Sequence, residues 1–176
     1  MPAKAAIVSP SDVRGLIGLM GLNIFLLGAF AVRGADDQPI VFPTRKAEAL
    51  LAVLAVSPGA THRRERLAAL LWPNNSDEQA RSSLRQTLAL LRKALAPAGL
   101  PGIAAHGDTL AMDPAGIDVD TAAFDAALAA GTPEALGQAI ALYRGDFLDG
   151  MTLPSGEAFE EWLGLERAQR IGRAHV

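Results

Sequence analysis

The clearest pattern of apolar and polar positions in the chain runs from Ser76 to Leu95. Apolar residues recur there at helical spacing: Ala80, Leu84, Leu88, Leu91 and Leu95. Ser76 can cap the first turn with Gln79 as its partner in a capping box, and Pro97 follows as a helix breaker. The spacing therefore predicts a helix over residues 76–95 that buries one face in a core.

The opposite face of this helix carries small, amide and basic side chains. Residues that point away from the apolar stripe or flank it are polar or basic: Arg81, Ser82, Ser83, Arg85, Gln86, Arg92 and Lys93. Ser82, Gln86 and Lys93 point most directly away, at about 100° per residue. Serine and glutamine can hydrogen-bond base edges, and arginine can hold phosphates. A solvated basic face is the competing interpretation. The neighbouring segments of the sequence are needed to choose between a DNA-binding face and a solvated one.

A run of apolar residues near the N-terminus predicts a strand over Leu22–Val32, with a polar turn at residues 34–38 and a return strand over Pro39–Phe42. The apolar stretch begins at Leu16 and is 17 residues long, the lower limit for a membrane helix, and it includes Asn23. We therefore expect a strand here and no membrane association.

Two more helices are expected between this hairpin and residue 76. Thr44 can cap the first, which ends at the helix breakers of residues 57–59 and buries Ala47, Leu50, Leu51 and Leu54. Thr61 can cap a second over residues 63–71.

A short hairpin is expected after the main helix, with strands over residues 103–105 and 109–112 around the turn His106-Gly107-Asp108. Strands, three helices and a terminal hairpin make an α+β fold, a winged helix-turn-helix over residues 21–115.

The segment from Gly116 to Arg170 predicts helices, with a break between the first two at residues 131–133. Its expected inward positions are Phe124, Leu128, Leu136, Ala139, Ile140, Tyr143, Phe159, Trp162, Leu163 and Leu165. We expect an all-α, tetratricopeptide-like fragment that is cut short. Phe159 and Trp162 should then remain exposed, because further repeats would be needed to cover them.

The two ends of the chain depart from these patterns. Residues 1–20 are expected to be a flexible extension, with Met20 as an alternative start to Met1. Residues 171–176 resemble the in-frame translation of a sequencing adapter, which would mean that the gene was truncated.

Charge divides the chain into halves of opposite sign. Residues 44–95 carry nine Lys/Arg and four Asp/Glu, whereas residues 116–176 carry four Arg and ten Asp/Glu. The basic half could face a polyanion. The absence of cysteine excludes disulfides, thiolate metal sites and cysteine catalysis, and the three histidines are scattered. We expect no cofactor.

Several long motifs, in this order, resemble a known bacterial architecture. Residues 22–32, 42–55 and 67–95 resemble the winged-helix DNA-binding domain of OmpR/PhoB type, in the version found in antibiotic-regulatory transcriptional activators. I-D-V-D-T-A-A-F-D, A-L-Y-R-G-D-F-L-D-G and F-E-E-W-L-G-L-E-R resemble the start of the helical bacterial transcriptional activator domain that follows it there. The resemblance implies a cytoplasmic transcriptional activator that binds double-stranded DNA, with RNA polymerase and a second copy on repeated half-sites as further partners.

The resemblance also implies a set of DNA contacts, some of which this sequence changes. The expected set is Arg45, Lys46, Arg63, Arg64, Arg81, Ser82, Ser83, Arg85, Gln86, Arg92 and Lys93. Leu90 stands where relatives often carry arginine, and Arg63 stands where a capping serine is usual. The wing has His106 and Asp108 in place of arginine, which weakens its expected contact with the minor groove.

Features that resemble catalytic sites are better explained by structure. Asp118, Asp120 and Asp125 lack the glycine and terminal glutamate of a calcium loop, so helix capping is the preferred role. No phosphate-binding glycine loop or Ser/His/Asp set is present, and we expect no enzyme in this chain. Two alternatives to a DNA-binding regulator stay open. One is a protein-interaction module on the same scaffold, and the other is a membrane-anchored or enzymatic protein whose active part lies elsewhere.

Overall fold

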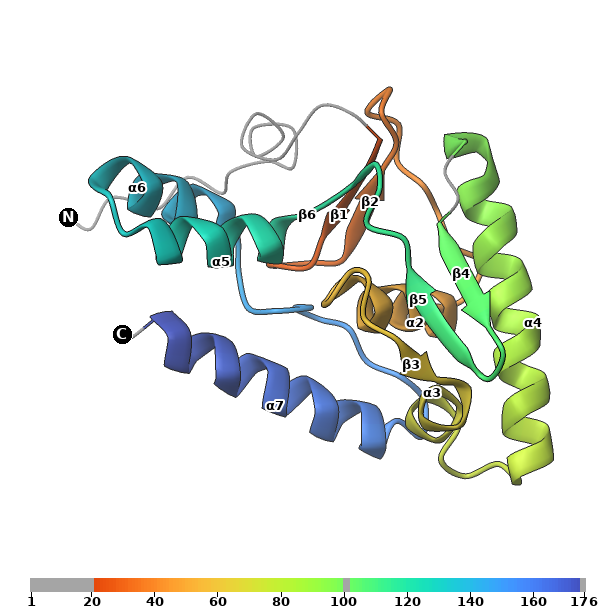
Figure 1. Ribbon diagram of the computed structural model, residues 1–176. Coiled ribbons are helices and arrows are strands. Elements are labelled where there is room, and N and C mark those ends of the chain that lie inside the picture. Colours follow the sequence, from red (N-terminus) through yellow and green to blue (C-terminus); the bar gives the residue numbers. More distant parts are fainter. Residues whose placement is uncertain (1–20, 100–101, 175–176) are drawn as a thin grey trace.

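The computed structural model describes residues 21–99 and 102–174. Figure 1 shows α4 along one side of the molecule and α5, α6 and α7 on the opposite side, with α2 between them. The elements, in chain order, are β1 (Leu22–Phe25), β2 (Ala31–Arg33), α2 (Arg45–Ala55), β3 (His62–Arg63), α3 (Arg64–Leu71), α4 (Asp77–Leu95), the 3₁₀ turn η1 (Ala96–Ala98), β4 (Ile103–His106), β5 (Thr109–Met112), β6 (Ile117–Val119), α5 (Asp120–Ala130), α6 (Pro133–Leu142) and α7 (Glu157–Ala174).

The first sheet has the strand order β2-β1-β6. Strand β1 is antiparallel to β2 and parallel to β6, with Ile24 opposite Val32 on one side and opposite Val119 on the other. A strand from the middle of the chain therefore completes the N-terminal sheet.

The prediction of a single strand over Leu22–Val32 is wrong. The chain turns at Gly28, which has a φ of 94°, a conformation that favours glycine. The Gly28 N–H donates to the carbonyl of Asp146 at 3.0 Å, so a distant segment holds the turn. The return strand over Pro39–Phe42 is also wrong, because only an isolated bridge between Arg33 and Pro39 is present there. Every side chain from residue 22 to residue 27 is buried. The sequence therefore shows no alternation of apolar and polar residues that would indicate where the strand ends.

Helix α2 forms the centre of the core. The Thr44 hydroxyl accepts a hydrogen bond from the Ala47 N–H at 3.1 Å, which confirms the predicted cap. Leu50, Leu51 and Leu54 have no exposed surface, as expected. Burial extends further than the predicted stripe, because every residue from 49 to 55 is buried. A helix that is apolar all round packs between other elements on several sides.

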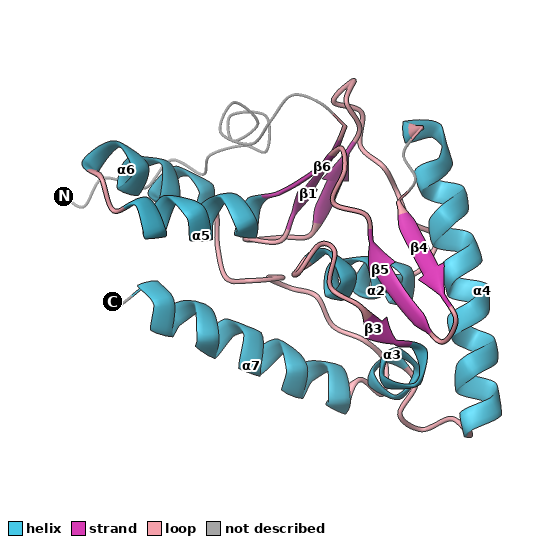
Figure 2. Ribbon diagram, in the orientation of Figure 1, coloured by secondary structure: helices cyan, strands magenta, loops and turns pink. Residues whose placement is uncertain are grey.

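Helices α3 and α4 follow, and the hairpin β4–β5 lies beside them (Figure 2). The hairpin, or wing, confirms the two strands predicted around Gly107, and β3 joins it to make a second sheet of order β3-β5-β4. Residues 62 and 63 are strand, so α3 begins at Arg64 and the predicted cap by Thr61 is wrong. The Arg64 N–H instead donates to the carbonyl of Asp108 in the wing turn at 2.8 Å. Backbone pairing with the wing therefore takes the place of a side-chain cap.

The hydrophobic core crosses the boundary that was expected between residues 115 and 116. Phe147, Phe159 and Leu163 belong to the same cluster as the buried residues of α2, α3 and α4. The expected exposure of Phe159 and Trp162 is wrong. Phe159 has no exposed surface, and the half-buried ring of Trp162 packs on Phe147 with ring centroids 5.9 Å apart. Helix α7 thus covers this part of the core.

Helices α5 and α6 form the predicted pair, separated by Gly131 and by the cap residue Thr132. Phe124 and Ala139 are buried between them and β1, in a second small cluster. Leu136, Ile140 and Tyr143 were expected to face inward and do not, because they are 41%, 76% and 50% exposed. Leu165 on α7 was also expected to face inward, and it is 59% exposed.

The end segments are only partly described. Residues 1–20, on which the flexible extension and the alternative start at Met20 were predicted, lie outside the described residues. Helix α7 continues through Ile171–Ala174, and the last two residues of the expected adapter segment lie outside. Within residues 21–99 and 102–174, no helix is both long and apolar enough to cross a bilayer.

Candidate nucleic-acid interface

The capping and apolar stripe of α4 fix which of its faces points outward. The Ser76 hydroxyl accepts from the Gln79 N–H at 3.3 Å, and the Gln79 amide oxygen accepts from the Ser76 N–H at 3.2 Å. This confirms the predicted capping box. The five predicted stripe residues and Thr87 are buried. The helix therefore cannot rotate without exposing its leucines.

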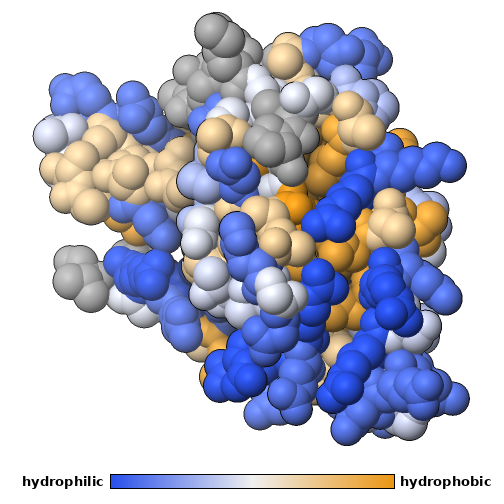
Figure 3. Space-filling view, turned by 45° about the vertical axis from the view of Figure 1, so that its right-hand side comes forward, coloured by the Kyte–Doolittle hydropathy of each residue, from blue (hydrophilic) through white to orange (hydrophobic). Residues whose placement is uncertain are grey.

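The opposite face of α4 is open. Arg81, Arg85, Gln86 and Lys93 are exposed, and Ser82 and Ser83 are half-buried. Among the residues that the structure describes, no hydrogen bond or ion pair occupies the first four side chains. Figure 3 shows the side of the molecule to which α4 belongs, where hydrophilic side chains gather with hydrophobic residues between them. The structure thus brings the predicted residues of this helix onto one accessible surface.

Arg92 differs from the rest of the predicted arginine row. Its Nη2 donates to the carbonyl of Ile103 in β4 at 3.1 Å, so this side chain ties α4 to the wing. The flank of α4 that carries the arginines therefore lies toward the wing. The guanidinium keeps further donors, because arginine has five N–H groups.

Lys46 was predicted to contact DNA, but the structure engages it inside the molecule. Its ammonium donates to the carbonyl of Leu71 at 2.7 Å and lies 5.1 Å from the centre of the Trp72 ring. Burial lowers the pKa of Lys46. Lys46 therefore caps the C-terminal end of α3, where the last carbonyl groups lack hydrogen-bond donors within the helix.

The other predicted basic residues are partly paired. Arg45 is exposed and lies 3.6 Å from Glu48 on the same helix. Arg63 lies 3.6 Å from Asp108 of the wing turn, and both side chains are mostly exposed. Arg64 is half-buried, and its buried Nε has no hydrogen-bond partner within residues 21–99 and 102–174. The exposed pair of Arg63 with Asp108 is of a weak kind, so Arg63 can exchange it for a phosphate, and the Arg45 guanidinium is itself 65% exposed beside a half-buried Glu48.

A cleft of about 180 Å³ lies between α2, α3 and α7 and is lined by Val53, Val56, Ser57, His62, Arg66, Leu67, Leu70, Trp162 and Glu166. The Nε2 atom of His62 is buried, and no described residue forms a hydrogen bond with it. Burial lowers the pKa of His62, which favours the neutral ring. Arg66, an exposed arginine at this cleft, was outside the predicted set.

Asp120 and Asp125, which were expected to cap helices, make other contacts in the structure. Asp120 accepts hydrogen bonds from the N–H groups of Leu26 and Leu27 at 2.8 and 2.9 Å, whereas α5 has no side-chain cap. The described residues contain no group of three or more His, Cys, Asp or Glu side chains placed to hold a metal ion.

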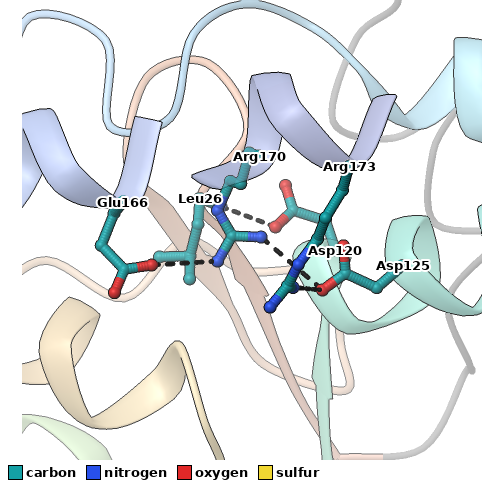
Figure 4. A network of polar contacts seen from close by, with 6 residues as sticks. All are labelled: Leu26, Asp120, Asp125, Glu166, Arg170 and Arg173. Atoms are coloured by element: carbon teal, nitrogen blue, oxygen red, sulfur yellow. Dashed lines mark hydrogen bonds and ion pairs between the residues drawn. The ribbon is translucent and has the colours of Figure 1, made fainter. Parts of the chain in front are cut away.

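A network of charges joins α7 to α5 (Figure 4). Asp125 lies 3.8 Å from Arg170 and 3.0 Å from Arg173, and Arg170 also lies 3.6 Å from Glu166. Burial lowers the pKa of Arg170, while Asp125 and Glu166 counteract that effect. Sequence reasoning missed this network, because the two helices carry no local signal of their pairing.

Comparison with solved structures gives a match over most of the chain. The chain is similar to EmbR of Mycobacterium tuberculosis, in a structure of that protein in complex with a low-affinity phosphopeptide, with a TM-score of 0.70 and 24% sequence identity. The match covers 88% of this chain and 44% of the EmbR chain, so this chain spans less than half of that structure's length. No protein-family model matches the sequence, and no curated protein matches it. At this identity, the similarity establishes that the two proteins share a fold over most of this chain.

Proposed function

We propose that this protein is a transcriptional regulator that binds specific sequences of duplex DNA and reads the major groove with α4. The observation that carries the proposal is the outer face of α4, where Arg81, Arg85, Gln86 and Lys93 are exposed and unoccupied by other described residues. A helix set on a packed core with such a face can enter a groove about 12 Å wide. The fold shared with EmbR supports the same proposal.

Different side chains of α4 would make different kinds of contact with DNA. Arg81 and Arg85 lie along the flank of α4 nearer the wing and would hold phosphates, which gives affinity without sequence information. Gln86 points away from the core and would pair with the N6 and N7 atoms of adenine. Ser82, Ser83 and Lys93 would complete the contacts of this helix, while Arg45, Arg63 and Arg64 would contact the backbone beside it.

The finer features of the proposal rest on the resemblance of the sequence motifs. They are an OmpR/PhoB-type domain over residues 21–115, the start of a bacterial transcriptional activator domain over residues 116–170, and a cytoplasmic activator that contacts RNA polymerase and pairs with a second copy on repeated half-sites. EmbR's phosphopeptide is not carried over, because more than half of that chain lies outside the match.

The experiment is selection of bound fragments from random duplex DNA, followed by affinity measurements over a range of salt concentrations. Binding should fall steeply with salt, and Arg85→Ala should reduce the slope of log K against log salt by about one. Gln86→Ala should relax the preference at one base position, at a cost of about 1–3 kcal/mol in discrimination. Because the two residues are adjacent and face differently, each variant is the control for the other. A chain that shows no salt-dependent duplex binding would refute the proposal.

A protein-interaction module on the same scaffold is the second candidate, and the wing favours it. His106 and Asp108 supply no fixed positive charge there, and Asp108 already lies 3.6 Å from Arg63. Asp108→Asn separates the two candidates. If the protein binds DNA, this variant should bind all duplexes more tightly, because it frees Arg63 and removes a negative charge.

A further inference from the structure

Leu90 is a large hydrophobic side chain exposed on the helix that we propose enters the groove. It is 39% exposed, and of the large exposed hydrophobic side chains in the described residues it alone lies on α4. A single exposed leucine is common on protein surfaces, so exposure by itself decides nothing. The position of Leu90 relative to Gln86 and Arg85 is what distinguishes it from other exposed leucines.

Leu90 lies on the flank of the outer face opposite the arginines. It follows Gln86 by four residues, which places it about 40° around the helix from Gln86. Arg85 lies about 100° from Gln86 in the other direction. Across the outer face, the order is therefore phosphate-binding arginine, then amide, then leucine. An isobutyl group cannot bind a phosphate or donate to a base edge.

We propose that Leu90 contacts the 5-methyl group of a thymine, which is the apolar group that DNA presents in the major groove. This inference rests on the proposed function. Side chains four residues apart on a helix are about 5–6 Å apart, and base pairs are stacked at about 3.4 Å. The thymine should therefore lie one or two base pairs from the adenine that Gln86 reads.

The test removes the methyl group from the DNA and the side chain from the protein. In the site selected by the wild-type chain, each thymine is replaced in turn by deoxyuridine, which differs only by the methyl group. One replacement should weaken wild-type binding about fourfold, the effect of withdrawing one buried methyl group. Leu90→Ala should bind the thymine and deoxyuridine duplexes equally, and Gln86→Ala should keep the difference. Leu165→Ala removes a leucine that is 59% exposed on α7 and serves as the matched control, with the difference intact.

The outcomes separate this inference from the proposed function. If the wild-type chain binds a preferred sequence but no deoxyuridine replacement weakens it, the inference is overturned while the proposed function stands. A Leu90→Ala variant that still distinguishes thymine from deoxyuridine also overturns it. If the wild-type chain shows no sequence preference, both proposals fall.

Discussion

Replacing Asp120 with alanine should destabilise the protein far more than replacing an exposed polar side chain. Asp120 has no exposed surface and accepts hydrogen bonds from the N–H groups of Leu26 and Leu27 at 2.8 and 2.9 Å. Arg144 lies 3.4 Å from the same carboxylate, is 8% exposed and stacks 4.7 Å from the centre of the Phe25 ring. Burial raises the pKa of Asp120, whereas the N–H donors and Arg144 lower it. The carboxylate joins the start of α5 to the end of β1.

The expected loss follows from what the substitution leaves behind. Removal of the carboxylate leaves two buried N–H groups without an acceptor and a buried guanidinium without a counter-ion. Breaking a buried pair from one side costs about 3–5 kcal/mol, and the whole free energy of unfolding of a protein is about 5–15 kcal/mol. We expect Asp120→Ala to lose about 4 kcal/mol. Asp120→Asn should lose about half of that, because its amide keeps one acceptor but turns a donor toward the second N–H.

Urea unfolding of the full chain measures both losses. Asp118→Ala is the control, because Asp118 is half-buried in the same sheet, on β6, and no side-chain hydrogen bond or ion pair is found for it among the described residues. That variant should lose less than about 0.5 kcal/mol. If Asp120→Ala also lost less than about 1 kcal/mol, the buried carboxylate would not be a structural clamp.

Two further substitutions test the start of α4 and the strand β3 that precedes α3. Ser76→Ala should lower the free energy of unfolding by about 1 kcal/mol through loss of the capping box, whereas Ser82→Ala, farther along the same helix, should not; equal losses would contradict the cap. For His62, burial holds the pKa below the ordinary 6.5, so its contribution to stability is complete above that value and is lost as the pH falls toward the folded-state pKa. His62→Gln should flatten the thermal-melting profile between about pH 7 and pH 5, and an unchanged profile would show that other groups set it.

Local sequence patterns predicted the helices and strands that are formed by contacts between residues close together in the chain. Helix α4 follows from the leucine spacing and the capping box, α2 from Thr44 and its apolar run, and the wing from two short runs around Gly107. In each case the deciding contacts lie within a few residues along the chain. The accessible outer face of α4 follows from its composition, because polar and basic side chains opposite an apolar stripe favour contact with water.

Contacts between distant segments could not be predicted in this way. The parallel pairing of β6 with β1 and the clamp of Asp120 on Leu26 join residues more than ninety positions apart. The same limit applies to the predicted site, because Lys46 finds its acceptor 25 residues away at Leu71. A basic residue in a favourable pattern shows that it can bind a phosphate, but not whether the fold already occupies it.

Measurements on Arg92 can distinguish a basic residue that binds phosphate from one that is engaged within the fold. The sequence places it in one row with Arg85, whereas the structure ties it to the carbonyl of Ile103 at 3.1 Å. Arg92→Ala should therefore loosen the wing strand β4 and lower the free energy of unfolding by about 1 kcal/mol, the contribution of a typical hydrogen bond. Arg85→Ala should leave stability unchanged, because no described residue pairs with Arg85.

The DNA-binding assay completes the comparison of these two arginines. Arg85→Ala should reduce the salt slope by about one, whereas Arg92→Ala should weaken binding mainly by misplacing the wing and change the slope by less. Arg92→Lys keeps the charge and one donor, so it should recover most of the lost stability if the bond to Ile103 is what matters. If Arg92→Ala instead left stability unchanged and reduced the slope as much as Arg85→Ala, the guanidinium would leave the wing for a phosphate. In the DNA-bound protein, Arg92 would then lie in one row with Arg85, as the helical spacing predicts. Its hydrogen bond to Ile103 would belong to the free protein alone.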